Sequence, residues 1–387
     1  MIETYLNPPH GGKLINRVLS EKEASKALEQ AKNFPTVQLD EELVKDVKNI
    51  ARGVYSPLMG FLEKDDFEQS VHEKKLANGL VWSIPIVLSV SREKAKEFGK
   101  GSRITLVGPD NQPVALMTVE DMYGFDPADV TQNVYGTTDQ THPGVAYVYA
   151  WQPVLIGGPI DLIDNSKTPF EHVNLDPWET RVMFKEKGWK TVAGFQTRNA
   201  PHRAHEYLQR CALEICDGLF INPIIGRKKT GDFQDHIIIK AYTHMIQNYF
   251  PRNSAVFSIL PAMMRYAGPR EAIQHAIIRK NFGCTHFVVG RDHAGVGDYY
   301  GPFDAQKIFD TIEDFGIHIL KFDNSFMCSK CGCMATVKTC GHADEFHTGP
   351  SGTKIRKLVQ AGEMVPEAIM RPDVAKILIT EKDVFVP

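Results

Sequence analysis

The chain has 387 residues, a length that favours two or three domains. Apolar residues make up 43% of it and charged residues 24%, which is typical of a globular protein and excludes an intrinsically disordered chain. Its 44 Lys and Arg residues nearly balance its 47 Asp and Glu residues, giving a formal net charge of −3. This balance argues against general binding of nucleic acid or of an anionic membrane, but it is compatible with a local basic site.

No segment predicts secretion or membrane insertion. The N-terminus lacks a basic stretch followed by an apolar one. The longest run without charge, residues 140–160, approaches the length of a membrane helix, but three prolines and three glycines interrupt it. We therefore expect a cytoplasmic protein with no membrane partner.

The first 160 or so residues predict a mixed, mainly β domain with attached helices. Ser20 and Glu23 have the spacing of a capping box for a polar helix. Asp40 is placed to cap a second helix. Strand-like apolar runs follow at 81–90, 103–107 and 114–119.

From about residue 176 strand-like and helical segments alternate, which predicts βαβ units and a parallel, doubly wound sheet, an α/β fold. Ligands of such sheets bind beyond the carboxyl ends of the strands, so the loops there are expected to carry the chemistry. The expected strands are 191–195, 218–225, 255–260, 286–289 and 317–322, and the expected helices 201–215, 234–249, 269–282 and 304–315.

The loop after the first of these strands is dense in anion-binding side chains. Pro201 is expected to set the first turn of the next helix, which places His202 and His205 on one face near its N-terminus. Free backbone N–H groups and the helix dipole favour an anion there. A single histidine in this position would more often be structural, but the whole cluster favours function. It comprises Gln196, Thr197, Arg198, Asn199, His202 and His205.

A second loop follows the strand at 286–289. Its glycines allow the backbone to approach a ligand closely, and its charged side chains can bind oxyanions or a ribose. A Gly-rich turn alone is a weak signal; its place at the same edge of the sheet makes it informative. The loop contains Gly290, Arg291, Asp292, His293, Ala294, Gly295 and Gly297.

A third element, Ser351 to Arg356, opens a late helix. Ser351 is either an ordinary N-cap or, with the paired histidines, half of the two-part signature of nucleotidylyltransferases, which embraces a triphosphate. A P-loop, a dinucleotide-binding glycine motif after a strand and a nucleophile elbow are all missing from the sequence. The crevice is therefore expected to hold oxyanions.

Four of the seven cysteines fall within 13 positions, with a spacing typical of structural zinc. The expected ligands are Cys328, Cys331, Cys340 and His347, with His342 as the alternative fourth ligand. A set of reduced thiols in a turn is the other interpretation. The role of Cys333 stays open, and Cys211, Cys216 and Cys284 are expected to be structural.

With these motifs the chain resembles the ATP sulfurylase (sulfate adenylyltransferase) family over essentially its whole length. The long, collinear blocks are more specific than any single motif; Ala200 departs from them, because many members carry Pro or Leu there. The blocks are 55–62 (YSPLMGFL), 194–205 (GFQTRNAPHRAH), 260–272 (LPAMMRYAGPREA) and 290–295 (GRDHAG).

The resemblance implies three regions and a reaction. The regions are a PUA-like N-terminal domain at 1–170, a Rossmann-like catalytic domain at 171–322 and a C-terminal region with the Cys-rich segment at 323–387. The implied reaction converts ATP and sulfate to adenosine 5′-phosphosulfate and diphosphate with Mg²⁺. Some members carry a zinc segment, so structural Zn²⁺ is also expected, and the family favours a homo-oligomer, dimer or larger.

Site roles follow from the same resemblance. Sulfate would be held by Gln196, Arg198 and the backbone of Ala294. The nucleotide would be held by Gln196, Arg198, Asn199, His202, His205, Gly290, Arg291, Asp292, His293 and Phe326. The catalytic set would be Thr197, Arg198, Asn199, His202 and His205.

Two alternatives remain at this point. One is another nucleotidylyltransferase with a different anionic acceptor. The other is a zinc-stabilised nucleotide-binding protein without catalysis. The complete set of oxyanion ligands argues against the second, and block 196–199, which matches the sulfate enzyme, argues against the first.

Overall fold

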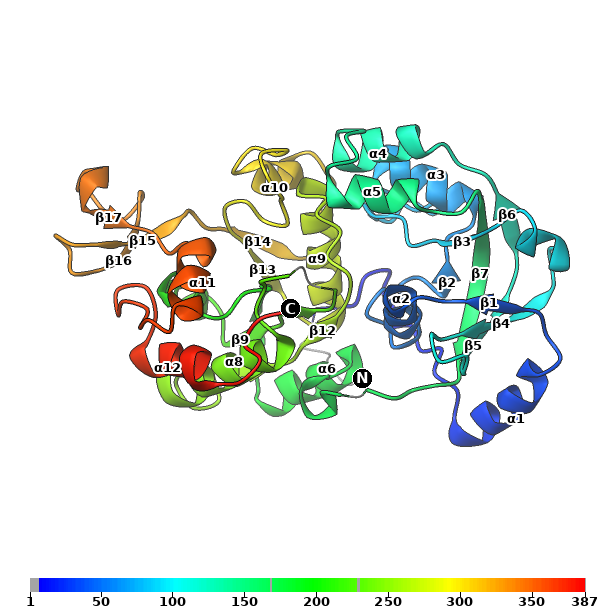
Figure 1. Ribbon diagram of the computed structural model, residues 1–387, viewed down its shortest axis with the longest axis horizontal. Coiled ribbons are helices and arrows are strands. Elements are labelled where there is room, and N and C mark those ends of the chain that lie inside the picture. Colours follow the sequence, from blue (N-terminus) through cyan, green and yellow to red (C-terminus); the bar gives the residue numbers. More distant parts are fainter. Residues whose placement is uncertain (1–6, 168, 228–229, 387) are drawn as a thin grey trace.

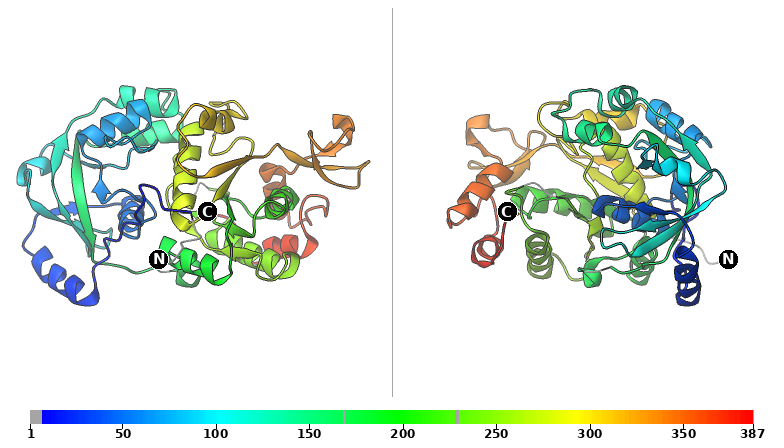
Figure 2. Two further views of the ribbon diagram at one scale, coloured as in Figure 1. Left: turned by 180° about the vertical axis from the view of Figure 1, so that it is seen from behind. Right: turned by 45° about the vertical axis from the view of Figure 1, so that its right-hand side comes forward.

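The chain folds into an N-terminal β lobe and a C-terminal α/β lobe, and a small three-stranded ribbon projects from the second lobe (Figure 1). The structure is a computed structural model that describes residues 7–167, 169–227 and 230–386. Both views of Figure 2 show the ribbon extending away from the N-terminal lobe. Among the described residues, no helix combines the length and apolar character needed to cross a bilayer.

The N-terminal lobe is built around one seven-stranded, mostly antiparallel sheet, which confirms the mainly β prediction. Its strands run in the order β1-β4-β5-β7-β2, and β3 and β6 also pair with β7. The strands are β1 (Thr36–Gln38), β2 (Gly60–Phe61), β3 (Leu88–Val90), β4 (Arg103–Val107), β5 (Pro113–Thr118), β6 (Asp121–Tyr123) and β7 (Val154–Leu162). The helices are α1 (Glu21–Ala31), α2 (Glu41–Ala51), α3 (Lys64–Glu73), α4 (Pro127–Tyr135) and α5 (Pro143–Tyr149), with a 3-10 turn at Lys94–Glu97.

The predicted helix starts of this lobe are confirmed, but one predicted strand is mostly wrong. Ser20 and Glu23 form a reciprocal capping box, and the Asp40 side chain accepts the backbone N–H of Leu43. Of the run 81–90 only Leu88–Val90 pairs as a strand. Residues 81–87 are apolar because they are buried in the core, which does not require a ladder partner.

The C-terminal lobe contains the predicted parallel sheet, with strand order β11-β9-β8-β13-β14. Its sheet residues alternate between two apolar cores, one on each face, which confirms a doubly wound arrangement. The strands are β8 (Val192–Phe195), β9 (Gly218–Ile221), β11 (Ala255–Phe257), β13 (His286–Val289) and β14 (His318–Lys321), with a small pair β10 (Ile224–Ile225) and β12 (Leu260–Pro261). The helices are α6 (Pro177–Glu186), α7 (Arg203–Leu213), α8 (Asp235–Tyr249), α9 (Pro269–Phe282) and α10 (Asp304–Lys307).

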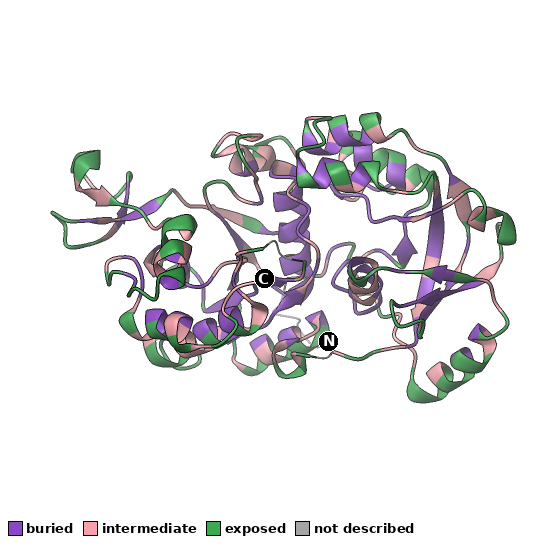
Figure 3. Ribbon diagram, viewed as in Figure 1, coloured by how far each residue is buried: buried purple, intermediate pink, exposed green. Residues whose placement is uncertain are grey.

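Helix α9 is buried along nearly its whole length and lies between the two lobes (Figure 3). Every residue from Arg270 to Phe282 is buried, including the charged ones. The buried guanidinium of Arg270 donates to the backbone carbonyls of Ser70 and Val71 in the N-terminal lobe, which compensates part of the cost of burying its charge. We expect Ile277→Ala to cost about 2–5 kcal/mol of stability, since its side chain is fully buried.

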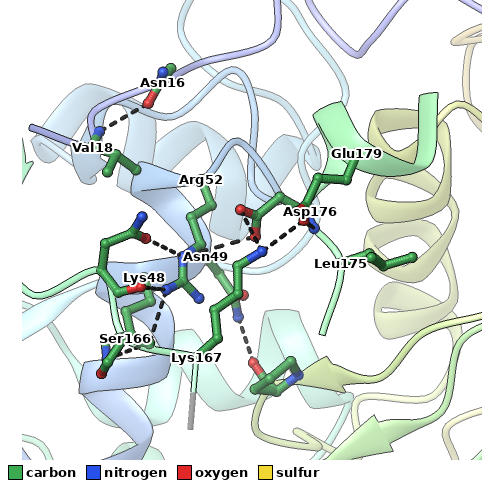
Figure 4. Close-up of polar contacts among 12 residues, drawn as sticks. Asn16, Val18, Lys48, Asn49, Arg52, Ser166, Lys167, Leu175, Asp176 and Glu179 are labelled. Carbon is green, nitrogen blue, oxygen red and sulfur yellow. Dashed lines mark hydrogen bonds and ion pairs between the residues drawn. The ribbon is translucent and has the colours of Figure 1, made fainter. Parts of the chain in front are cut away.

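A polar network ties the connection between the lobes to helix α2 (Figure 4). The guanidinium of Arg52 donates to the backbone carbonyls of Asn165 and Ser166. Lys167 bridges Asp176 at 3.0 Å and Glu179 at 2.7 Å. These contacts fix where the C-terminal lobe begins relative to the N-terminal lobe.

The C-terminal region consists of the ribbon and two helices. Its elements are β15 (Ser325–Cys328), β16 (Cys333–Thr336), β17 (His347–Thr348), α11 (Gly352–Gln360) and α12 (Pro372–Thr380), with a 3-10 turn at Asp344–Phe346. The expected helix at 304–315 ends early, since α10 passes into a 3-10 turn at Ile308–Asp310.

Candidate functional site

Both predicted loops line one cavity of about 280 Å³ beyond the carboxyl ends of β8 and β13. The parallel sheet brings them together because the two strands are neighbours and run in the same direction. Of the predicted residues, the cavity is lined by Gln196, Thr197, Arg198, Asn199, His202, His205, Gly290, Arg291, Asp292, His293, Ala294 and Gly295.

The turn from β8 into α7 is fixed by its own polar groups. The hydroxyl of Thr197 accepts the backbone N–H of Asn199 at 3.2 Å. Helix α7 begins at Arg203 with His202 as its N-cap, two residues later than the predicted start at Pro201. The reason is that His202 has extended backbone angles and its Nδ1 accepts the backbone N–H of His205 at 3.3 Å.

His202 and His205 stack on each other, with ring centroids 3.7 Å apart. Burial lowers the pKa of His202 to about 4, and burial together with the neighbouring His202 ring lowers the pKa of His205. Both rings are therefore neutral at pH 7 in the free protein. Because Nδ1 of His202 accepts a hydrogen bond, its proton lies on Nε2, which is then a donor for an oxyanion.

His205 has a partner that the sequence did not indicate. The hydroxyl of Tyr242, on α8, lies 3.3 Å from Nδ1 of His205. Burial raises the pKa of Tyr242, so the phenol keeps its proton. A phenol that donates to Nδ1 leaves the proton of His205 on Nε2, as in His202.

The guanidinium of Arg198 lies over the ring of Tyr266, 4.8 Å from its centroid. Tyr266 is held in a left-handed backbone conformation with φ of 61°. Its carbonyl lies 3.1 Å from Nε2 of His142, a residue of the N-terminal lobe. A planar ring beneath a planar cation restricts the orientation of Arg198 and leaves its N–H groups free for an oxyanion.

The loop after β13 is shaped by left-handed backbone at Asp292 and Ala294, with φ of 53° and 57°. The N–H of Asp292 donates to the carbonyl of Pro302, and the N–H of Gly268 to the carbonyl of Ala294. The N–H of Ala294 itself has no acceptor among the described residues. Since Ala294 lines the cavity, this N–H is available to a bound anion.

Phe326 is not where the resemblance implies, and Ser351 shows the ordinary N-cap, one of its two interpretations. Phe326 does not line the cavity: it is only 4% exposed and stacks on His347 with centroids 3.7 Å apart. Ser351 acts as the N-cap of α11, and Arg356 lies 3.7 Å from Asp232, so neither lines the cavity. His347, which covers Phe326, and Asp232, which lies beside Arg356, come from other segments, whereas the cap bond of Ser351 to Lys354 is local.

Part of the cavity lining was not predicted from the sequence. The side chain of Met264 has no local signal, and around β15 only Phe326 and the metal ligands were expected to have a role. The block 260–272 was quoted only as a resemblance, although it supplies Tyr266 and Met264. The missed lining residues include Leu208, Met264, Asp323, Asn324, Ser325 and Pro350.

Cys328, Cys331, Cys340 and His342 come together in the ribbon, with their ligand atoms all within 4.8 Å of one another. The Sγ atoms of Cys331 and Cys340 are 3.6 Å apart, and Nδ1 of His342 is 3.2 Å from Sγ of Cys331. Zinc bonds of about 2.1–2.3 Å place tetrahedral ligands roughly 3.3–3.8 Å apart, so the set fits this metal. The cluster can hold a metal ion.

The fourth residue of this cluster is His342, the alternative, rather than His347. Nε2 of His347 is 3.4 Å from Sγ of Cys340, but its ring is stacked on Phe326 and its Nδ1 lies 3.2 Å from Asp344. Cys333 is exposed and outside the group of four. Cys216 and Cys284 are buried, and Cys211 is half-buried.

Two family models match the chain. The ATP-sulfurylase model matches residues 171–381, which contain the parallel sheet, the cavity and the Cys-rich ribbon. A PUA-like domain model matches residues 7–165, which contain the antiparallel sheet. The two matches cover the two lobes in turn.

Curated proteins named sulfate adenylyltransferase are similar to nearly the whole chain. The one from Thermococcus onnurineus is 48% identical over 98% of this chain and 100% of its own length. Those from Hyperthermus butylicus and Synechocystis are 49% and 48% identical over 98% and 96% of this chain, and over 97% and 96% of their own lengths. A solved hexameric APS kinase from Thiobacillus denitrificans shares the fold, with a TM-score of 0.77 over 97% of this chain and 69% of that chain at 22% identity.

Proposed function

The chain belongs to the ATP-sulfurylase family, and we propose that the cavity beyond the carboxyl ends of β8 and β13 is where it acts as a sulfate adenylyltransferase. In this reaction ATP and sulfate give adenosine 5′-phosphosulfate and diphosphate. One observation carries the assignment to this cavity. A single pocket at the carboxyl edge of a parallel sheet combines Arg198, two neutral N–H-donating histidines and the backbone N–H of Ala294, which has no acceptor among the described residues.

Sulfate would bind to Gln196, Arg198 and the N–H of Ala294. These groups offer neutral and cationic donors from both loops, so a tetrahedral oxyanion can be held between them. The ring of Tyr266 restricts the guanidinium of Arg198 before the substrate arrives. Pre-orientation of this kind lowers the entropy that is lost on binding.

The nucleotide would lie against the remaining lining. His202 and His205 would donate from Nε2 to the β- and γ-phosphates, and residues 290–293 would hold the nucleoside part. Thr197 and Asn199 keep the turn in shape through their mutual hydrogen bond. The lining also includes the carboxylates Asp292 and Asp323, ligands of the type that Mg²⁺ prefers, so a Mg²⁺–ATP complex fits the cavity.

The chemical step needs no general base, because sulfate is already a dianion at neutral pH. One sulfate oxygen forms a bond to the α-phosphorus, and the bond from the α-phosphorus to the bridging oxygen breaks in line. The electron pair leaves with diphosphate, where negative charge develops. Fixed positive electrostatics and positioning are therefore the means by which the protein accelerates the reaction, as in phosphoryl transfer.

Sulfate-dependent release of diphosphate from ATP tests this assignment, together with ATP formation from adenosine 5′-phosphosulfate and diphosphate. We expect turnover in both directions and competition by molybdate or selenate. Arg198→Ala is expected to lower the rate about 100- to 1,000-fold in a folded protein. The exposed Arg92→Ala is the matched control. Near-normal turnover by Arg198→Ala would contradict the assignment.

We also propose that the ribbon binds one structural Zn²⁺ through Cys328, Cys331, Cys340 and His342. A set of three thiols and one imidazole supports zinc over other divalent metals. Purified wild-type protein is expected to contain about one zinc per chain, and Cys328→Ser should lose it. Cys333→Ser is the control that should keep it, and comparison of His342→Asn with His347→Asn identifies the fourth ligand. Zinc-free wild-type protein from a chelator-free preparation would contradict the proposal.

The proposal also includes the region boundaries, the cellular location and the subunit number. The regions divide at about residues 170 and 322, with the Cys-rich region last. The enzyme works in the cytoplasm as a homo-oligomer, a dimer or larger. Light scattering of the purified chain measures its subunit number.

A further inference from the structure

A buried chain of three side chains runs from helix α9 to the cavity wall. Glu271 and His275 lie one helical turn apart on α9 and are 2% and 3% exposed. Nε2 of His275 is 3.5 Å from Oε1 of Glu271, and its Nδ1 is 3.0 Å from Nε2 of His293. None of these contacts is needed to explain how the oxyanions bind.

The side-chain carboxylate of Glu271 is ionised and can only accept hydrogen bonds. The oxygens of Glu271 accept the backbone N–H groups of Arg265 at 2.8 Å and Ala267 at 3.0 Å. These donors and His275 hold the pKa of Glu271 below its usual value, although burial works in the opposite direction. The hydrogen between Glu271 and His275 is therefore carried by Nε2 of His275.

The two histidines are neutral, so each carries one ring proton. Burial lowers the pKa of His275, although Glu271 opposes it, and burial and His275 lower the pKa of His293. The nearby cation of Arg279 lowers both further. With its proton on Nε2, His275 presents a lone pair on Nδ1, and Nε2 of His293 must donate to it.

This order of donors leaves Nδ1 of His293 without a proton. Nε2 of His293 bonds to His275, whereas Nδ1 has no hydrogen-bond partner in the described part of the chain. The residue lines the cavity. A lone pair there attracts N–H or O–H groups and repels phosphate or sulfate oxygens.

We propose that Glu271 and His275 are positioning residues that hold His293 as a hydrogen-bond acceptor, so that it selects a donor group on the nucleoside rather than an oxyanion. The donor would be the 6-amino group of the base or a ribose hydroxyl. The ligand part of this inference rests on the proposed function, because it takes ATP as the occupant. The positions of the protons on Glu271, His275 and His293 do not depend on the proposed function.

The first test determines which ring nitrogen of His293 carries the proton. Imidazole ¹⁵N chemical shifts distinguish a protonated from an unprotonated ring nitrogen, and the signals of His293 are identified by their loss in His293→Gln. We expect His293 to carry its proton on Nε2 in the wild-type protein. His275→Asn, whose Oδ1 can still accept, should keep this state, and His275→Leu should release it. A proton on Nδ1 of wild-type His293, or on both nitrogens at pH 7, would overturn the proposal.

The second test measures nucleotide selectivity. Affinities are determined by calorimetry in the absence of sulfate. The ligands are ATP, inosine triphosphate, which has a 6-oxo group instead of the amino group, and 2′-deoxy- and 3′-deoxy-ATP. Wild-type protein should discriminate against the analogue that lacks the relevant donor. His275→Leu should lower this discrimination about five- to tenfold, the value of one neutral hydrogen bond, and His275→Asn should restore it.

His10→Leu is the matched control, since it removes another buried histidine that does not line the cavity. It should change stability without changing selectivity. Equal affinity of the wild-type protein for all four nucleotides, or unchanged discrimination in His275→Leu, would overturn the ligand part. Absence of any ATP binding would instead contradict the proposed function, and the ¹⁵N measurement would still decide the proton order.

Discussion

The two walls of the cavity use the same residue type with opposite hydrogen-bonding character. On the β8–α7 wall, Nδ1 of His202 is occupied by a backbone N–H, so Nε2 carries the proton and donates. On the β13 wall, Nε2 of His293 is engaged by His275, and Nδ1 is left as an acceptor. Both rings are neutral, so charge does not distinguish them. The atom that faces the ligand is determined by the group behind the ring.

This difference divides the cavity into a part suited to oxyanions and a part suited to the nucleoside. The oxyanion part also contains Arg198. The backbone N–H of Ala294, which comes from the loop after β13, contributes to it as well. In the proposed reaction charge develops on diphosphate, so donors on the first wall would stabilise the transition state. An acceptor on the second wall contributes mainly to binding, which affects KM more than kcat.

The largest expected effect is found by comparing the kinetic constants of a variant on each wall. His202→Ala should lower kcat for sulfate-dependent diphosphate release about 100- to 1,000-fold. His293→Ala should raise KM for ATP by about tenfold or less, because it removes one neutral hydrogen bond. The exposed His72→Ala serves as control. Equal losses of kcat in both folded variants would remove the distinction between the walls.

A smaller effect is expected at Tyr242, which orients the second donor of the first wall. Tyr242→Phe removes the hydroxyl beside Nδ1 of His205 and frees the ring to place its proton on either nitrogen. We expect kcat to fall about five- to tenfold with little change in fold. Tyr249→Phe, on the same helix, removes a hydroxyl that is not bonded to His205 and should retain full activity. Wild-type kcat in Tyr242→Phe would show that His205 needs no such partner.

The pH dependence of ATP binding should sharpen the comparison further. A triphosphate beside Nε2 favours the cationic form of His202, so binding raises its pKa from about 4 and takes up protons. Affinity of the wild-type protein should therefore rise more steeply than that of His202→Gln as the pH falls from 7 to 5. Calorimetry in buffers of different ionisation enthalpy measures the proton uptake. Protonation of ATP itself is the same for both proteins, so equal uptake would contradict this role.

The smallest effect concerns the protein without ligand. The folded pKa of His202, about 4, is below the ordinary value of 6.5, so the unfolded chain binds more protons between these limits. Stability should thus fall as the pH is lowered from 6.5 toward 4. His202→Gln should lose less stability than the wild-type protein over this range. Urea midpoints at pH 7 and pH 5 measure the difference, and identical shifts would contradict the lowered pKa.

Much of the fold followed from local patterns. The caps at Ser20 and Asp40 bind neighbouring backbone groups, so short-range sequence was sufficient to place those helices. The parallel sheet followed from the alternation of apolar strands and helices. The run 81–90 was misjudged because burial and strand pairing both produce apolar sequence.

The candidate site could also be predicted in part from the sequence. Residues at the ends of β8 and β13 could be placed together, since neighbouring parallel strands end at one edge. Phe326 could not be placed, because its surroundings depend on how the ribbon folds over it. The fourth residue of the metal cluster had the same difficulty, as His342 and His347 have equally suitable spacing in the sequence.

The sequence by itself determined which chemical groups the protein brings to its cavity, because strand ends and cysteine spacing are local properties. The tertiary structure decided how those groups are protonated and which atoms they present. His202 receives its partner from its own helix, but His205 and His293 receive theirs from α8 and α9. Hydrogen bonds act only over about 3 Å, so these assignments exist only after distant segments have packed together.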